Sequence, residues 1–171
     1  IVDGYGTKKV ASILTLNKKT NLNVRYASQK DEKLLLNWAN DPLVRANAFK
    51  TNFISKHKHE LWFNKRLKSS KLCKILLIQN EDSLPVGQVR IEKKAGNWFI
   101  DFSLANFARK NKLGTKLLSL ALSEFEKKGI KSFYAEVKSN NLSSLKAFER
   151  AGFKKKSTNV NFITYIYTKK L

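Results

Sequence analysis

One segment in the second half of the chain limits the fold more than any other, an amphipathic helix set between two strands. Leucine, alanine and phenylalanine recur at three- and four-residue spacing over residues 115–128, which is the pattern of a helix with one apolar face. A strand over 98–104 precedes this helix across a polar, basic loop, and a strand over 132–138 follows the helix stop at Gly129. This succession predicts a mixed α/β fold.

Strand and helix patterns fill most of the remaining chain, whose length of 171 residues suits one domain. Pro42 is expected to end the first helix, and Leu61, Trp62 and Phe63 are expected to point inward from the second. The predicted order is β-α-α-β-β-β-α-β-α-β-β. The elements outside the segment above are strands over 24–27, 74–80, 86–94 and 161–168, a short strand that opens at 153, and helices over 31–40, 56–67 and 142–150.

Residues 1–23 stand apart from the domain that we predict at 24–171. They contain Asp3-Gly4-x-Gly6, a short helical pattern over 7–14 and the polar stretch NKKTNLN, which has the composition of a linker. The segment resembles the C-terminal end of nucleotide-sugar hydrolases, which implies that the chain is the C-terminal part of a longer two-domain enzyme. An ordinary N-terminal helix is the alternative interpretation.

The chain is strongly basic, with 34 lysines and arginines against 13 acidic residues and a formal net charge of +21. Such a surface attracts anions, among them nucleic acid, ribosomes, acidic membranes, phosphorylated cofactors and nucleotide sugars. The lysines are scattered along the whole sequence, so a generally cationic surface accounts for them as well as a dedicated polyanion site does.

Other features argue against a membrane, disulfide or metal protein. No apolar run approaches the roughly 20 residues of a membrane helix, and residues 1–16 lack the pattern of a signal peptide, so we expect a cytoplasmic protein with no membrane partner. Cys73 is the only cysteine and lies in an apolar strand, which excludes an internal disulfide and favours a core position. His57 and His59 are the only histidines, and no metal site is predicted.

Residues 109–153 carry the pattern that points to a function. The basic loop RKNKLGT over 109–115 leads into the amphipathic helix, and backbone N–H groups at the start of a helix can hold a phosphate. The strand FYAEV then precedes Asn141, Ser144, Phe148 and Gly152-Phe153. From 24 to about 168, the chain closely resembles the acetyl-CoA core of the GNAT superfamily of N-acetyltransferases. The resemblance implies an α/β (α+β) fold with a mixed, mostly antiparallel central sheet flanked by helices, and acetyl-CoA as co-substrate.

The same resemblance implies which residues hold the cofactor. In that family the loop reads Arg/Gln-x-x-Gly-x-Gly/Ala, and here Lys112 replaces the first glycine and adds positive charge. Asn141 has a second interpretation as a helix N-cap. The implied contacts are Arg109, Lys110, Lys112, Leu113, Gly114 and Thr115 for the pyrophosphate, the backbone of Phe102, Ser103 and Leu104 for the pantetheine arm, and Asn141, Ser144 and Phe148 on the other side.

The implied chemistry is attack of a neutral amine on a thioester, which needs a proton acceptor and a donor that polarises the carbonyl oxygen. Asp101 is a candidate base because it shares a strand face with Ser103 beside the cofactor loop, where this family often places a carboxylate. His59 has a suitable intrinsic pKa, although an exposed helix position is the favoured interpretation, and Glu136 ranks last. Phe148 stands where many members have a tyrosine acid, so that role is empty, moved or taken by solvent.

Two features of the sequence indicate which acceptor is acetylated, the stretch WANDPLVR over 38–45 and Phe49. The stretch resembles the substrate side of two GNAT branches, one that acetylates the 4-amino group of UDP-linked amino sugars in pseudaminic-type pathways and one that acetylates N-terminal amines of ribosomal proteins. The sugar branch fits better, which implies Trp38, Asn40, Arg45 and Phe49 as acceptor-binding residues, with Arg45 on a nucleotide phosphate. A catalytically inactive CoA- or RNA-binding module is the third alternative. Binding to nucleic acid or a ribosome is not favoured.

Overall fold

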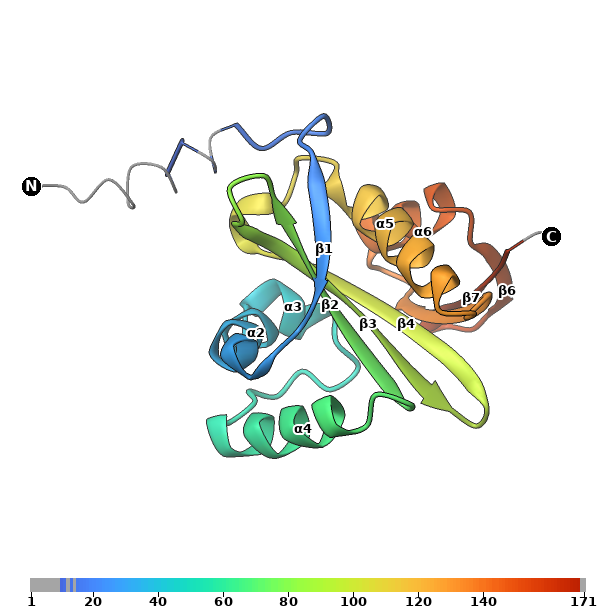
Figure 1. Ribbon diagram of the computed structural model, residues 1–171. Coiled ribbons are helices and arrows are strands. Elements are labelled where there is room, and N and C mark those ends of the chain that lie inside the picture. The colour runs from blue at the N-terminus through green and yellow to red at the C-terminus, as the bar shows by residue number, and fades with distance from the viewer. Residues whose placement is uncertain (1–9, 12, 14, 170–171) are drawn as a thin grey trace, which may run out of the picture.

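The computed structural model describes residues 10–11, 13 and 15–169, and these build one seven-stranded sheet with helices on both faces (Figure 1). The strand order is β1-β2-β3-β4-β5-β7-β6, and every neighbouring pair is antiparallel except β4 and β5. This arrangement confirms the predicted fold class. The strands are β1 (Leu22–Tyr26), β2 (Cys73–Asn80), β3 (Pro85–Lys94), β4 (Asn97–Leu104), β5 (Ser132–Lys138), β6 (Lys154–Thr158) and β7 (Phe162–Thr168).

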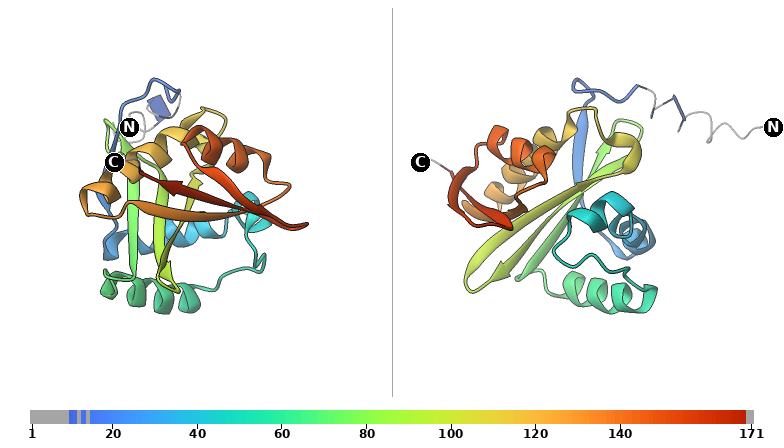
Figure 2. Two further views of the ribbon diagram at one scale, coloured as in Figure 1. Left: turned by 90° about the vertical axis from the view of Figure 1, so that its right-hand side faces the viewer. Right: turned by 180° about the vertical axis from the view of Figure 1, so that it is seen from behind.

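The helices divide between the two faces of the sheet (Figures 1 and 2). Helices α2, α3 and α4 lie on one face, whereas α5 and α6 cover the other. No helix in the described part of the chain is long and apolar enough to cross a bilayer. The helices are α2 (Glu32–Ala39), α3 (Pro42–Asn47), α4 (Lys56–Lys68), α5 (Leu113–Lys127) and α6 (Leu142–Arg150), with 3-10 turns η1 (Gln29–Asp31) and η2 (Asn106–Ala108).

Strand β2 shows how the sheet separates two hydrophobic clusters. Leu76 and Ile78 point to the large cluster under α5 and α6, whereas Ile75 and Leu77 point to a smaller one under α2 and α4. Leu76, Leu77 and Ile78 have no exposed surface. Because both faces of this strand are covered, its sequence is a continuous apolar run and not an alternating one.

The sheet opens in its middle, between β4 and β5. These two parallel strands share a single registered pair, Phe99 with Tyr134. By contrast, β3 and β4 are paired continuously from Gly87–Leu104 to Lys94–Asn97. Beyond Phe99 and Tyr134 the strands diverge, so the backbone groups on their facing edges are available to another partner.

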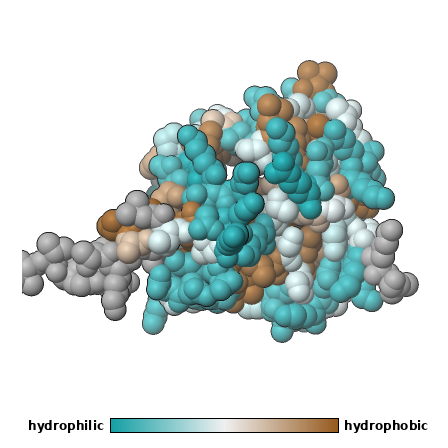
Figure 3. All heavy atoms as spheres, turned by 90° about the horizontal axis from the view of Figure 1, so that it is seen from above, coloured by the Kyte–Doolittle hydropathy of each residue, from teal (hydrophilic) through white to brown (hydrophobic). Residues whose placement is uncertain are grey.

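One edge of the sheet is strongly basic. Strand β6 is the outermost strand, and each of its five residues is exposed. It begins with Lys154, Lys155 and Lys156. On the face shown in Figure 3, hydrophilic side chains predominate and the hydrophobic ones form separate patches.

Most predicted elements are present, but helix α3 was missed. Strand 132–138 and helix 142–150 begin and end where the patterns placed them. Pro42 follows the end of α2, yet it is also the first residue of α3. The Asp41 side chain accepts hydrogen bonds from the N–H groups of Leu43 and Val44, so Asp41-Pro42 is a helix start. Leu61 is a further correction, because it is 60% exposed.

The predicted linker is partly integrated with the domain. Leu16 is 5% exposed and belongs to the large hydrophobic cluster. The Lys116 Nζ of α5 donates to the Thr20 carbonyl at 2.6 Å. Residues 15–23 therefore pack against the sheet and α5, ahead of the domain start predicted at 24. The predicted helix over 7–14 and the Asp3-Gly4-x-Gly6 stretch lie mostly or wholly outside the described residues.

The close packing of Gly87 on β3 against α5 predicts how a larger residue at this position would change the stability of the protein. A Cβ on Gly87 would lie 2.6 Å from Leu117 Cδ2 and 2.6 Å from the Ser103 carbonyl oxygen, and the backbone cannot yield as a side chain can. Gly87→Ala should therefore lower the free energy of unfolding by ~1–3 kcal/mol in urea melts. Gly96→Asn is the control, since Gly96 has open space and a φ of +82°, which asparagine tolerates. Equal stability of Gly87→Ala and wild type would contradict this packing.

Candidate functional site

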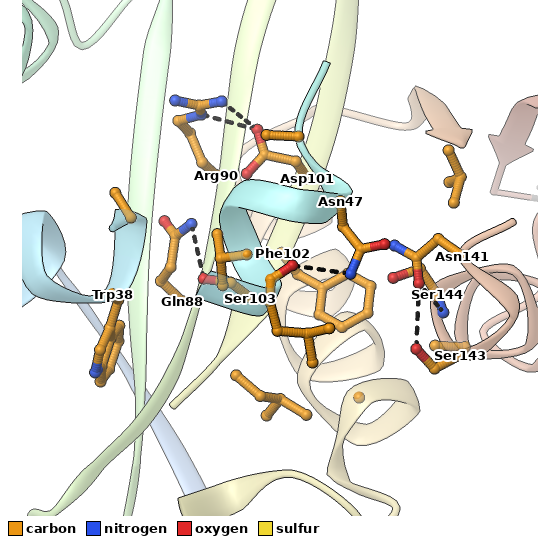
Figure 4. A pocket seen from close by; sticks show the side chains of 18 of the residues that line it. Trp38, Asn47, Gln88, Arg90, Asp101, Phe102, Ser103, Asn141, Ser143 and Ser144 are labelled. Atoms are coloured by element: carbon orange, nitrogen blue, oxygen red, sulfur yellow. Dashed lines mark hydrogen bonds and ion pairs between the residues drawn. The ribbon is translucent and has the colours of Figure 1, made fainter. Parts of the chain in front are cut away.

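A cleft of about 1040 Å3 lies where the sheet opens (Figure 4). Its walls come from α2, α3 and α4 on one side, from β3 and β4, from the loop and first turn of α5, and from the end of β5 with α6. The structure brings all the predicted site residues to this cleft except Asn40. Those that line it are Trp38, Arg45, Phe49, His59, Asp101, Phe102, Ser103, Leu104, Arg109, Lys110, Lys112, Leu113, Gly114, Thr115, Asn141, Ser144 and Phe148.

The loop before α5 has the backbone of an anion cradle. Lys110 and Lys112 have φ values of 64° and 58°, in the left-handed region that favours glycine. Lys112 is the N-cap of α5, and its side chain makes no capping hydrogen bond within the described chain. The first N–H groups of α5 are thus left for a ligand, and alternating left-handed residues turn successive N–H groups to one side. Lys112 keeps the conformation expected of the missing glycine, so the loop fits a pyrophosphate.

Glycine at 114 is explained by close packing. A Cβ there would lie 3.2 Å from Phe102 Cε2 and 3.5 Å from Ala147 Cβ, so α5 approaches both β4 and α6. Phe148 packs edge-to-face with Phe102 at a centroid distance of 5.4 Å and is 3% exposed. No hydroxyl is available at this position. The tyrosine on the neighbouring strand β5, Tyr134, does not line the cleft and so does not supply one.

Two further cofactor candidates make structural contacts. The Asn141 side chain caps α6 by accepting from the Ser144 N–H at 3.3 Å, which confirms its N-cap role. The Arg109 Nη2 lies 2.6 Å from Asp41 Oδ1 and 3.3 Å from the Leu104 carbonyl oxygen. Although burial opposes it, the hydrogen bond from Arg109 leaves the pKa of Asp41 below its ordinary value. Arg109 therefore joins the cofactor loop to the start of α3.

Two polar pairs form the floor of the cleft on the face toward α2–α4 (Figure 4). Gln88 Nε2 donates to Ser103 Oγ at 3.4 Å, and Arg90 Nε donates to Asp101 Oδ2 at 2.9 Å. Arg90 also lies over the Trp62 ring, 5.1 Å from its centroid. Burial disfavours its charge, but Asp101 more than offsets this and raises the pKa of Arg90. Asp101 is thus held in an ion pair, with one oxygen, Oδ1, outside it.

His59 is buried, which corrects the favoured interpretation of an exposed helix position. It is 4% exposed, its ring stacks on Phe63 at 5.7 Å, and it lines the cleft from α4. Its Nδ1 is buried with no hydrogen-bond partner among the described residues. Burial lowers the pKa of His59, and the charge of Glu32 opposes this only in part. A neutral imidazole therefore faces the cleft near pH 7.

The residues predicted to bind the acceptor make mostly structural contacts. The Asn40 amide pairs with both backbone groups of Ile54, at 2.8 Å each, and it fixes the segment that leads into α4. The Arg45 guanidinium donates to the carbonyl oxygens of Ala39 at 2.5 Å and Lys50 at 3.1 Å. Phe49 packs edge-to-face on Phe162 of β7. Two of the Arg45 nitrogens, Nε and Nη1, thus already donate to backbone carbonyls, although we expected this side chain to bind a phosphate.

Several lining residues were not found from the sequence. Gln88 and Arg90 lie on a strand whose alternation alone does not say which face meets a cleft. Lys138 ends β5 and donates to the Ala46 carbonyl of α3 at 2.9 Å. Asp41 does not itself line the cleft but pairs with Arg109, which does, and the sequence contained a sign of its role, since Asp before Pro is a common helix start.

Solved structures with similar folds include a spermidine N-acetyltransferase from Vibrio cholerae in complex with CoA and spermine. It has a TM-score of 0.76 at 15% identity, covering 86% of this chain and 95% of that chain. A Salmonella typhimurium protein solved with its cofactor acetyl-CoA has a TM-score of 0.70 at 15% identity, over 86% and 93% of the two chains. At such identities the likeness shows the fold.

Sequence comparison identifies a relative and a family. An uncharacterised protein of Methanocaldococcus jannaschii is 26% identical over 163 residues, which are 91% of this chain but only 31% of that protein. The chain thus spans less than a third of this relative's length. The family model described as an acetyltransferase (GNAT) domain matches residues 21–154. The chain therefore belongs to the GNAT acetyltransferase domain family.

Proposed function

We propose that this domain transfers the acetyl group of acetyl-CoA to the amine of a nucleotide-linked amino sugar of the UDP-4-amino-sugar type. The observation that carries the proposal is the charge of the cleft, which suits an anionic acceptor. A polycation such as spermine, bound by the Vibrio relative, would be repelled by it. The basic residues that line the cleft are Arg45, Lys50, Lys58, Arg90, Arg109, Lys110, Lys112, Lys138, Lys146 and Arg150, and the acidic ones are Asp101 and Glu136.

The basic side chains that have no partner indicate where two phosphorylated ligands would bind. Within the described chain, the ammonium groups of Lys110 and Lys112 make no ion pair or hydrogen bond, and they flank the cradle that we assign to the acetyl-CoA pyrophosphate. Lys50 and Lys58 are likewise without a partner among the described residues, and they lie on the α3–α4 side of the cleft. We assign Lys50 and Lys58, in place of Arg45, to the diphosphate of the acceptor.

The floor of the cleft has groups that suit a sugar. Ser103 Oγ and the Gln88 amide can each donate and accept hydrogen bonds, as sugar hydroxyls require. Trp38 lines the same region and is partly buried against both hydrophobic clusters. A basic peptide, such as a ribosomal protein N-terminus, would need more carboxylates than the cleft offers.

We assign His59 as the proton acceptor for the amine. Its imidazole is neutral and lines the cleft, whereas Asp101 is held by Arg90. Acetyl-CoA supplies the thioester, and a backbone N–H on β4 would polarise its carbonyl oxygen. The Arg90–Asp101 pair fixes the floor beneath the amine. With Phe148 in the position of the usual acid, the departing thiolate takes its proton from solvent.

The cofactor assignment predicts the effect of filling the space at Gly114. Gly114→Val should raise the dissociation constant of acetyl-CoA by ~10-fold or more, because the side chain pushes Phe102 and the first turn of α5 apart. Gly114→Ala should fall between Gly114→Val and wild type. Isothermal titration calorimetry measures both. Unchanged affinity in Gly114→Val would place the cofactor elsewhere.

The assignment of His59 predicts a pH dependence. Its folded pKa is below the ordinary value of about 6.5, so the imidazole gains a proton only as pH falls through that lower value, and kcat/KM should fall there. His59→Gln should lower kcat by ~100-fold and remove this acid limb. Asp101→Asn should keep the limb. If Asp101→Asn abolishes activity and His59→Gln does not, then Asp101 is the base.

The acceptor assignment predicts a selective loss. Replacing both Lys50 and Lys58 by alanine should raise KM for a UDP-amino sugar by ~100-fold or more, since two charged contacts of roughly 1.5–3 kcal/mol each are lost. The acetyl-CoA affinity should stay unchanged. The matched control replaces the exposed pair Lys18 and Lys19, which lies outside the cleft, and it should leave both constants unchanged.

A competition assay separates the acceptor classes. Free UDP should inhibit competitively against the acceptor, and a basic peptide should not. If UDP has no effect and a ribosomal-protein N-terminus is acetylated, the amino-sugar proposal is wrong. If no amine is acetylated while acetyl-CoA binds, the domain is a cofactor-binding module without catalysis.

A further inference from the structure

Helix α3 lies across the cleft and is tied to both of its sides. At its start, Asp41 Oδ1 contacts Arg109 Nη2 of the cofactor loop at 2.6 Å. At its end, the Ala46 carbonyl accepts from Lys138 Nζ of β5 at 2.9 Å. Figure 4 shows Asn47 of this helix between Phe102 on β4 and Asn141 at the start of α6. The helix therefore spans the gap where the two strands separate.

These ties are polar, and few apolar contacts support them. None of the six residues of α3 is fully buried, and Leu43 is 52% exposed. The hydrophobic effect thus adds little to the docking of α3, in contrast to α5, which buries six side chains. An interaction that removes one polar tie would change the position of α3 at small cost.

Arg109 has two candidate partners, the Asp41 carboxylate and the pyrophosphate of acetyl-CoA. Its guanidinium is bound to Asp41, with side-chain exposures of 20% and 15%, and its loop is the one that we assign to the acetyl-CoA pyrophosphate. A diphosphate carries more negative charge than one carboxylate and accepts bidentate hydrogen bonds from arginine. Arg109 Nη2 has two hydrogens, which already point to Asp41 Oδ1 and to the Leu104 carbonyl oxygen, so a phosphate oxygen can bind this group only by displacing one of them.

We propose that Asp41 and the pyrophosphate of acetyl-CoA compete for Arg109, so that cofactor binding releases the start of α3 and opens the acceptor side of the cleft. The inference rests on the proposed cofactor site and adds a positioning residue, Asp41, that sets cofactor affinity. Leu43, Val44 and Asn47 of α3 line the cleft, so movement of α3 alters the space for the acceptor.

The test is Asp41→Asn, since asparagine caps a helix as well as aspartate does. Removing the competing carboxylate should tighten acetyl-CoA binding by ~5–10-fold in calorimetry. Arg109→Ala should weaken binding, and adding Asp41→Asn to Arg109→Ala should change nothing more. Persistent tightening in the double variant would mean that Asp41 acts by general repulsion, and it would overturn the proposal.

Asp31→Asn is the matched control. Asp31 also lies at a helix start and pairs with an arginine, Arg25 at 2.7 Å, but Arg25 does not line the cleft, whereas Arg109 does. Asp31→Asn should lower thermal stability and leave acetyl-CoA affinity unchanged. A merely structural role for Asp41 predicts the same behaviour for both variants, and that result would overturn the proposal.

Amide hydrogen exchange gives an independent measurement on the complete chain. In wild type, acetyl-CoA should speed exchange at residues 43–47, and in Asp41→Asn exchange should already be fast without cofactor. Slower or unchanged exchange at these residues on cofactor binding would overturn the proposal. If Arg109→Ala, Lys112→Ala and Gly114→Val all leave acetyl-CoA affinity unchanged, the proposed cofactor site itself fails. If they weaken it but Asp41→Asn has no effect, only the competition fails.

Discussion

The separation of β4 from β5 is the constraint on which the rest of the structure depends. A single registered pair, Phe99 with Tyr134, joins the two halves of the sheet, and beyond it the facing backbone groups lack a strand partner. Such groups are costly to bury unsatisfied, so this region has to border a cleft or receive a ligand chain. We assign the arm of acetyl-CoA to this opening, where it would supply the hydrogen bonds of a missing strand. Helices α3 and α5 both lie at this opening, one on each face of the sheet.

The loop before α5, which borders the same cleft, contains strained backbone. Lysine at 110 and 112 takes a left-handed backbone that glycine adopts at no steric cost, and each such residue costs of order 1–3 kcal/mol. The surrounding packing must hold this conformation, with Leu113 fully buried directly after it. In return, each position adds a positive charge beside the N–H groups of α5. Lysine in place of the family glycine at 112 thus raises the energy of the backbone conformation but adds a charge that attracts a phosphate.

The sequence predicted the parts of the molecule that depend on local pattern. The apolar period of α5, the cap at Asn141 and the strand over 132–138 are set by residues within a few positions of one another, so they could be inferred without coordinates. Helix α3 was missed because Pro42 can end one helix and begin the next, and only the neighbouring Asp41 distinguishes the cases. The burial of His59 and the pairing of Asp101 with Arg90 depend on which elements meet across the sheet. No local pattern contains that information.

The exposed lysines of β6 limit how this protein can associate with itself. An outermost strand presents unpaired N–H and C=O groups that could extend the sheet into a second molecule. Three successive lysines place like charges along that edge in any such pairing, and the net charge of +21 adds a wider repulsion. Both effects act through water and weaken as the Debye length shrinks from about 8 Å at physiological ionic strength to about 3 Å in 1 M salt. The colloidal behaviour of the protein is therefore tied to ionic strength, and dilute buffers favour separate molecules.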